Sequence, residues 1–369
     1  LTKIDLSQSE VGGRALAALV ALLSNPDSTL TELRLSRGSL DDEGAVVLAP
    51  ALGRNSTLRK LYLAENWDVT NTGWRAIFTQ LQSPQSSLEE LVLQVNYIDN
   101  DATILLANAL ANSPRLKALC LGENQDISTE GWQALFVALQ SPHCVIKELF
   151  LNSNNLNDED MTYLANSLAN NRALREMDLC GNAEVTSSGW RAFAAVLQNP
   201  NSALEKLDLD CNQINDDVMV SFANSLVHNS KLKDMFLDDD FDGVTVTGWN
   251  ALSNVICNKM SINATFNSNH TLERVLDPGN MNDGDESQLP FDLRNLLQLN
   301  RENTKAEAAR RKILQVHFSG GDFSMEPFID MDLTSLPHAI AWMARDEYGS
   351  SLLYKFVRNT TFFAEVGAG

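Results

Sequence analysis

One short segment of the chain carries side chains that could hold a metal ion. The letters DDDFDG place carboxylates at Asp238, Asp240 and Asp242, followed by Gly243. Carboxylate oxygens at alternate positions, with a glycine for the turn, suit a hard cation such as calcium. A complete calcium loop of the helix–loop–helix type also needs a glutamate at its twelfth position, where this chain has Trp249. The pattern therefore favours an acidic loop insertion, and calcium-modulated binding stays as an alternative.

No other segment has its side chains in a catalytic arrangement. The five histidines are scattered, and no nucleotide-binding glycine loop, zinc-protease helix motif or serine-hydrolase elbow occurs. The five cysteines form no CxxC or Cys/His cluster, which indicates reduced thiols in a cytoplasmic or nuclear protein rather than a disulfide framework. The sequence therefore predicts a protein that is not an enzyme and has no cofactor.

The charge of the chain bears on the kind of partner it would bind. There are 28 Lys and Arg against 48 Asp and Glu, a net charge of −20, and nearly all of the excess falls within the first 290 residues. Such an acidic surface repels nucleic acid and anionic membranes and attracts basic protein surfaces. No apolar run is long enough to span a bilayer. We expect a protein partner with a basic patch, no nucleic acid and no membrane.

The elements that would position a binding site follow an internal repeat. The pattern LxxLxLxxN is clearest in the copies that begin at residues 58, 88, 116, 146, 174 and 204. From residue 30 to residue 232 the spacing between copies alternates between 28 and 30 residues. Alternation across LxL predicts a short strand, and the i, i+3, i+4, i+7 stripe that follows predicts a helix. Leu1 already falls inside a repeat, so we expect the natural N-terminus to lie upstream.

These motifs resemble leucine-rich repeats of the ribonuclease-inhibitor type, with their two alternating repeat lengths. The resemblance covers residues 1–277, about ten repeats, and implies an α/β solenoid: a horseshoe with an inner parallel β-sheet and outer helices. It also implies a non-enzymatic scaffold that binds a protein on the concave sheet face.

Residues 278–292 read as an acidic linker, and residues 293–369 as a helical region that caps the C-terminal end of the array. Helices are expected over 296–318, 333–348 and 350–366. This tail resembles those attached to repeat arrays in diatom-type algal proteins of unassigned function.

A different function is implied by a second resemblance. Activators of Ran-type GTPases use the same repeat together with an exposed arginine, and the letters GGRALAAL place Arg14 after a glycine in the first repeat. Ordinary repeats of this class share the G-x-R-A-L pattern. A GTPase-activating regulator is therefore retained as an alternative to the scaffold.

Two positions of the repeat predict structure rather than binding. Asparagines recur at the ninth position, where a buried amide can bond to backbone groups of the neighbouring turns. They are Asn66, Asn96, Asn124, Asn154, Asn182 and Asn212. Glycine–tryptophan pairs recur at Trp74, Trp132, Trp190 and Trp249, each at the head of a helical stripe. We interpret the tryptophans as buried spacers that set the packing of neighbouring helices.

The candidate binding residues flank the leucines of the strands, because those side chains point out of the inner sheet. Between the two leucines the middle repeats carry an apolar and aromatic stripe, beyond which the surface turns acidic. Exposed aromatic side chains on a rigid concave sheet are typical interface anchors. The predicted partner-binding residues are Tyr62, Val92, Cys120, Phe150, Asp178, Asp208, Asp210, Phe236 and Asp238.

Overall fold

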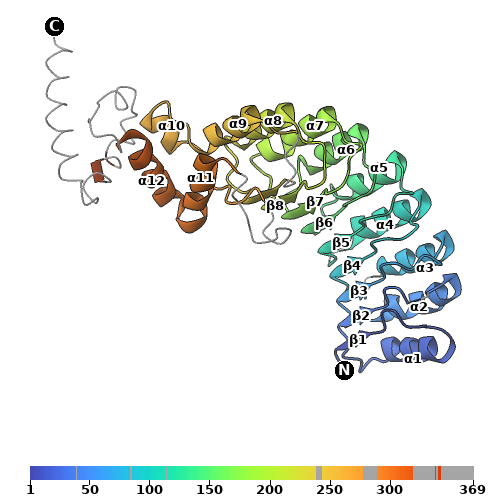
Figure 1. The fold of residues 1–369 in the computed structure, drawn as a ribbon. Helices are drawn as coiled ribbons and strands as arrows, with labels where there is room; N and C mark the ends of the chain where they lie inside the picture. Colours follow the sequence, from blue (N-terminus) through green and yellow to red (C-terminus); the bar gives the residue numbers. More distant parts are fainter. Residues whose placement is uncertain are drawn as a thin grey trace, which may run out of the picture.

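The computed structural model describes residues 1–38, 40–83, 85–113, 115–237, 243–276 and 289–318, together with positions 337, 340 and 341. Over these residues strands and helices alternate along the chain, as the repeat predicts. Figure 1 shows the strands along the inner side of a curved array and helices α1 to α9 along its outer side. The chain is therefore an α/β solenoid, which confirms the fold class predicted from the sequence.

The nine described strands form one parallel sheet in the order β1 to β9, so every strand pairs with its neighbours in sequence. Leucines of successive strands lie opposite each other, as in the pairing of Leu33 with Leu61 and of Leu61 with Leu91. The strands are β1 (Lys3–Asp5), β2 (Glu32–Arg34), β3 (Lys60–Tyr62), β4 (Glu90–Val92), β5 (Ala118–Cys120), β6 (Glu148–Phe150), β7 (Glu176–Asp178), β8 (Lys206–Asp208) and β9 (Asp234–Phe236).

Each helix buries one stripe of side chains against the back of the sheet and against its neighbours. Polar caps begin most of them, as Asp41 does for α2 by accepting a hydrogen bond from the Gly44 amide. The outer helices are α1 (Gly13–Ser24), α2 (Asp42–Arg54), α3 (Asn71–Leu81), α4 (Asn100–Asn112), α5 (Thr129–Ala138), α6 (Asp158–Leu168), α7 (Ser187–Gln198), α8 (Asp216–Leu226) and α9 (Val246–Ile256).

The repeated tryptophans lie inside the helix layer. Trp74, Trp132 and Trp190 are at most 1% exposed, and Trp249 is 6% exposed. The Trp132 ring stacks on Phe136 of the same helix, with 5.9 Å between the ring centroids. The tryptophans are therefore core residues, as predicted.

The glycine before three of the four tryptophans lies against a carboxylate from the preceding helix. The Gly73 amide donates to Asp42 Oδ1 at 2.9 Å, and Thr70 donates its amide and its hydroxyl to the same carboxylate. A Cβ atom on Gly73 would lie 2.6 Å from Val69 Cγ1 and 2.7 Å from Asp42 Oδ1, so any side chain there would force these neighbours to move. The same contacts recur in the sets Asp158, Thr186, Gly189 and Asp216, Thr245, Gly248. The contact thus joins α3, α7 and α9 each to the helix before it.

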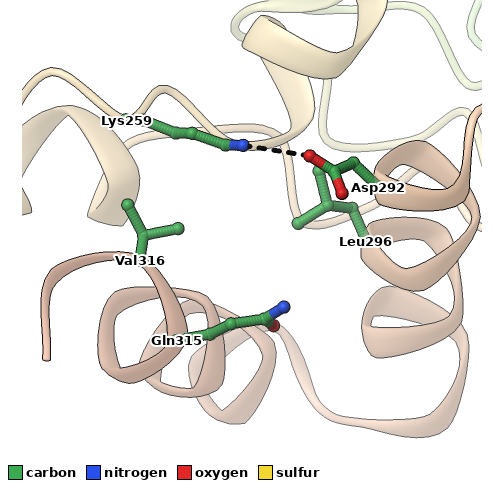
Figure 2. Close-up of a pocket in the computed structure, with 5 residues that line it drawn as sticks. All are labelled: Lys259, Asp292, Leu296, Gln315 and Val316. Atoms are coloured by element: carbon green, nitrogen blue, oxygen red, sulfur yellow. Dashed lines mark hydrogen bonds and ion pairs between the residues drawn. The ribbon is translucent and has the colours of Figure 1, made fainter. Parts of the chain in front are cut away.

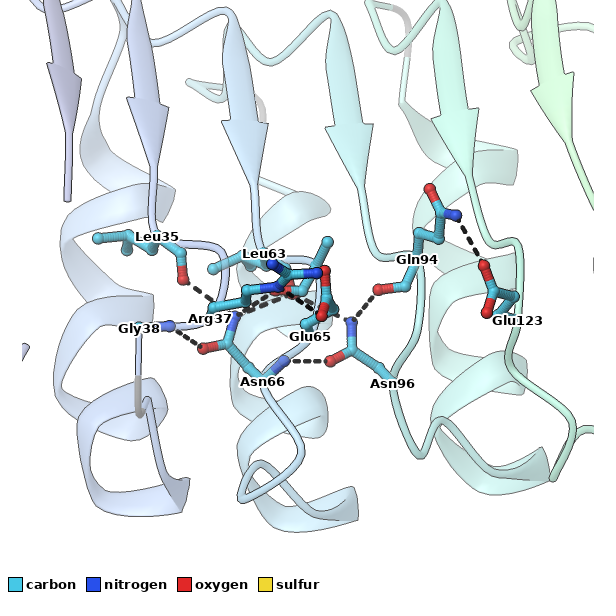
Figure 3. A network of polar contacts seen from close by, with 10 residues as sticks. Leu35, Arg37, Gly38, Leu63, Glu65, Asn66, Gln94, Asn96 and Glu123 are labelled. Carbon is cyan, nitrogen blue, oxygen red and sulfur yellow. Dashed lines mark hydrogen bonds and ion pairs between the residues drawn. The ribbon is translucent and has the colours of Figure 1, made fainter. Parts of the chain in front are cut away.

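A buried ladder of asparagines joins the turns that follow the strands (Figure 3). The Asn66 amide nitrogen donates to the carbonyls of Leu35 and Leu63, and its backbone amide donates to Asn96 Oδ1 at 2.8 Å. Asn96 then repeats the arrangement by donating to the Leu63 and Leu93 carbonyls. Each asparagine thus satisfies backbone groups of two successive turns, which is the structural role expected from the sequence.

Beyond the last outer helix come α10 (Ile262–Phe266), α11 (Phe291–Glu302) and α12 (Lys305–His317). Helix α11 packs against α9, and α12 packs against α10 and α11. The fully buried Lys312 donates hydrogen bonds from Nζ to the carbonyl of Ile256 at 2.8 Å and to that of Asn269 at 3.3 Å. Ile256 is the last residue of α9, so this lysine ties α12 to the C-terminal end of the outer helix layer. Of the helix expected over 333–348 only positions 337, 340 and 341 are described, and they are helical; the helix expected over 350–366 and most of the expected linker lie outside the described residues.

Candidate binding surface on the inner sheet face

Six of the predicted binding residues form one row across the inner sheet. The strand register places Tyr62 beside Val92, Val92 beside Cys120, and Cys120 beside Phe150. Asp178 and Asp208 follow on the next two strands. All six side chains are partly exposed. A partner that reached the concave face would therefore meet an apolar stripe that ends in two neighbouring carboxylates.

Tyr62 is held in place by charged neighbours. The Arg34 guanidinium lies over its ring, 4.4 Å from the ring centroid, and its hydroxyl donates to Glu90 Oε1 at 2.7 Å. Burial and the hydrogen bond to Glu90 raise the pKa of the Tyr62 hydroxyl, so it stays neutral. An aromatic ring fixed in this way loses little side-chain entropy when it is covered.

The carboxylates at the end of the row have a different environment. Asp178 Oδ1 accepts a hydrogen bond from the Cys180 amide at 2.9 Å, and Asp208 Oδ1 accepts one from the Asp210 amide at 3.0 Å. Burial, with a further contribution from the negative charge of Asp208, raises the pKa of Asp178 to about 6. Asp178, Cys180 and Asp208 bring one ligand atom each to within 4.8 Å of one another. Among the described residues, this is a group that could hold a metal ion.

Two predicted binding residues are buried, contrary to expectation. Phe236 is 3% exposed, because Lys206 extends its ammonium group over the ring, 5.4 Å from the centroid, and the next segment pairs with β9 through Arg274. Asp210 is 6% exposed. Neither side chain is available for a partner in this structure. Asp238 lies outside the described residues, as do Asp240 and Asp242 of the expected cation loop.

The face beside this row is less acidic than the sequence suggests. A shallow groove of about 480 Å³ crosses strands β6 to β9 and is lined by five basic and five acidic side chains. Glu205 pairs with Arg175 and with Lys233, and Arg274 donates two hydrogen bonds to Asp234. Much of the acidic charge predicted for this region is therefore balanced within the sheet face, and Asp178 and Asp208 are not among the residues that line the groove.

A second cavity, of about 250 Å³, lies among the last helices (Figure 2). Lys259 and Asp292 face each other across it, with 3.3 Å between Nζ and Oδ2, and Leu296, Gln315 and Val316 complete the lining. One exposed ion pair with one amide offers no arrangement for catalysis.

Arg14, the residue on which the GTPase-activator alternative depends, is exposed near the start of α1. It lies in the outer helix layer and not on the strands that carry the row. That alternative stays a prediction.

Sequence reasoning missed a pair of exposed aromatic side chains outside the sheet face. Trp67 is 56% exposed and Tyr97 is 62% exposed, and each directly follows a ladder asparagine in adjacent repeats. The signal was present in the repeat, because the same position is polar or small in the repeats that follow them. These two residues mark a second place where a partner could bind.

Comparison with known proteins identifies the repeat. Residues 27–49 and 201–223 match the family model described as Leucine Rich repeat. Over 63% of its length the chain is 30% identical to the NACHT, LRR and PYD domains-containing protein 14 of Mus musculus, of which it covers 23%. Over 57% of its length it is 30% identical to the Ribonuclease inhibitor of Mus musculus, of which it covers 45%. The chain thus spans less than half the length of these two relatives.

Solved structures that match part of the chain include the yeast complex of Rad7 and Elc1, at 16% identity over 64% of each chain and a TM-score of 0.42. Another is the Leiomodin-1 Actin-Binding Site 2, at 15% identity over 50% of this chain and a TM-score of 0.36. Across the described residues, no helix has the length and apolar character needed to cross a bilayer.

Proposed function

Because this chain is a leucine-rich-repeat protein similar to ribonuclease inhibitors, a class of protein-binding scaffolds, we propose that it binds a protein partner on the concave face of its sheet. The observation that carries this proposal is the row of partly exposed side chains Tyr62, Val92, Cys120 and Phe150 on adjacent strands. Repeat families of this kind are generally binding modules and not enzymes.

The chemistry of the row supports a partner with an apolar ridge beside a basic patch. The aromatic and aliphatic groups offer apolar area, and Tyr62 is already fixed by Glu90 and Arg34. Asp178 and Asp208 would meet the basic patch, and the net charge of −20 would steer it toward the array. Charge of this kind speeds association mainly at low salt.

The proposal is tested by capture of partners from the native cell with the immobilised chain, followed by mass spectrometry. The double variant Tyr62→Ala, Phe150→Ala should lose the partner that the unchanged chain captures, because it removes both aromatic anchors of the row. Circular dichroism and the melting temperature report whether the variant is folded.

The matched control is the double variant Trp67→Ala, Tyr97→Ala, which removes two exposed aromatic side chains beside the sheet rather than on it. This control should capture the partner as well as the unchanged chain does. Loss of capture in the control, with retention in the double variant of the row, would move the binding site to the turns after β3 and β4 and overturn the proposal.

A further inference from the structure

Three side chains with metal-binding atoms meet between strands β7 and β8, and a fourth contacts one of them. Asp178 and Asp208 are paired across the two strands, and Cys180 lies two positions after Asp178. The carboxylate oxygens and the Cys180 sulfur lie within 4.8 Å of one another. The thiol of the exposed Cys211 is in side-chain contact with the thiol of Cys180. Two carboxylates and two thiols are thus gathered from two successive repeats.

The backbone fixes the two carboxylates before any ligand arrives. Each accepts a hydrogen bond from the amide two residues later, Asp178 from Cys180 and Asp208 from Asp210. These bonds restrict the side-chain rotation of both carboxylates. The group is only partly buried, so an ion could enter from the concave side. A prearranged ligand set binds more tightly than one that has to be ordered by the ion.

The composition of the group favours a cation. Two carboxylates and a thiol bring one ligand atom each to within 4.8 Å of one another. A divalent cation bound there would stabilise the anionic forms of all these groups at once.

We propose that Asp178, Cys180, Asp208 and Cys211 bind a zinc-class divalent metal ion between the seventh and eighth strands. The thiols decide the class, because calcium and magnesium take oxygen ligands, whereas zinc and its neighbours bind sulfur and carboxylate together. They also distinguish this site from a receptor for an arginine side chain, to which carboxylates alone would bind. Binding converts each ligating thiol to a thiolate and releases its proton to the solvent.

The first strand provides a natural control for the site. Asp5 occupies the same position of the repeat as Asp178 and accepts a hydrogen bond from the Ser7 amide at 3.0 Å. Ser7 stands where Cys180 stands, and the paired residue on the next strand is Arg34 rather than an aspartate. Asp5 therefore has the same carboxylate geometry as Asp178 but lacks the neighbouring thiol and the second carboxylate.

The test is a titration of the full chain, freed of metal by a chelator and kept reduced, with cobalt(II) as a coloured probe for zinc. We expect one equivalent to bind, with a thiolate-to-cobalt charge-transfer band, and zinc to displace it. Cys180→Ser should weaken the band to about half or less, because at most one thiolate ligand is left, and Asp208→Asn should weaken binding by about 10-fold or more. Asp5→Asn should leave the titration unchanged.

Absence of the band in the unchanged chain, or a band of unaltered intensity in Cys180→Ser, would overturn the proposal. If an arginine-rich peptide binds there and cobalt(II) does not, the group is a receptor for basic side chains instead. Should Cys180→Ser fail to fold, Cys211→Ser replaces it, since that side chain is exposed and contributes a proposed ligand. An unaltered band and affinity in Cys211→Ser would remove Cys211 from the site and leave the three-residue group of Asp178, Cys180 and Asp208 to be tested by Asp208→Asn.

Discussion

The outer helix layer and the inner sheet face are built from the same repeats but use them in opposite ways. On the outer side, the same residue type returns at the same position, as Trp74, Trp132 and Trp190 show, and all three are buried. On the inner side, the row between the strand leucines changes chemical type from one strand to the next. Repetition serves packing, because each helix meets an equivalent neighbour. Variation provides a surface that can distinguish one partner from another.

The sharpest way to break this comparison is to remove a tryptophan from the outer layer. Trp132→Ala should cost about 3–5 kcal/mol of unfolding free energy, because the ring is fully buried and stacks on Phe136. Denaturant unfolding monitored by circular dichroism measures the loss. At temperatures where the variant is folded, partner capture should equal that of the unchanged chain.

The matched substitution Trp132→Phe should cost clearly less. The Trp132 indole Nε1 is buried without a hydrogen-bond partner, so phenylalanine removes volume and no hydrogen bond. Specific loss of capture in either folded variant would show that the outer layer takes part in recognition and would erase the distinction between the two sides.

The repeat made the fold predictable from the sequence, since leucine spacing fixes both the strand register and the helix phase. It also predicted which residues form the inner row. The burial of Phe236 was not predictable, because it depends on Lys206 and on the segment at Arg274 rather than on the position within the repeat. The contact of Cys180 with Cys211 was missed because the two residues lie one repeat apart and at different positions within it. Cys211 also has a positive φ of 55°, which strand or helix periodicity does not reveal.

A smaller effect of opposite sign is expected on the inner face. Asp178 has its ordinary pKa of 3.8 when unfolded and a pKa of about 6 when folded, so its ionisation opposes folding. The cost is absent at low pH, grows as pH rises from about 4 to about 6, and is constant above that. In metal-free buffer at pH 8, Asp178→Asn should therefore stabilise the chain by about 1 kcal/mol after allowance for partial exposure.

The asparagine oxygen can still accept the hydrogen bond from the Cys180 amide, so the substitution isolates the charge. Thermal unfolding at pH 4 and pH 8 measures the difference, which should vanish at the lower pH. Asp5→Asn serves as the control. Hydrogen bonds from Ser7 lower the pKa of Asp5, so the ionisation of this carboxyl does not oppose folding. If Asp178→Asn destabilised the chain at pH 8, the Asp178 carboxylate would be stabilised by its neighbours in the metal-free chain. The inner face would then carry no charge whose burial opposes folding, and this difference from the outer layer would be lost.

The smallest loss of stability should come from Phe150, the partly exposed aromatic residue that we propose as an interface anchor. Phe150 on β6 and Phe136 on α5 have the same side chain, but Phe136 is fully buried while Phe150 is partly exposed. Phe136→Ala should cost about 3–5 kcal/mol, whereas Phe150→Ala should cost about 1 kcal/mol, because its ring already contacts water in the free chain. Denaturant unfolding of the two variants compares one chemical change on the outer side of one repeat and on the inner side of the next. Equal losses would mean that the inner row is held as tightly as the core, and Phe150 would then be a packing residue rather than an interface anchor.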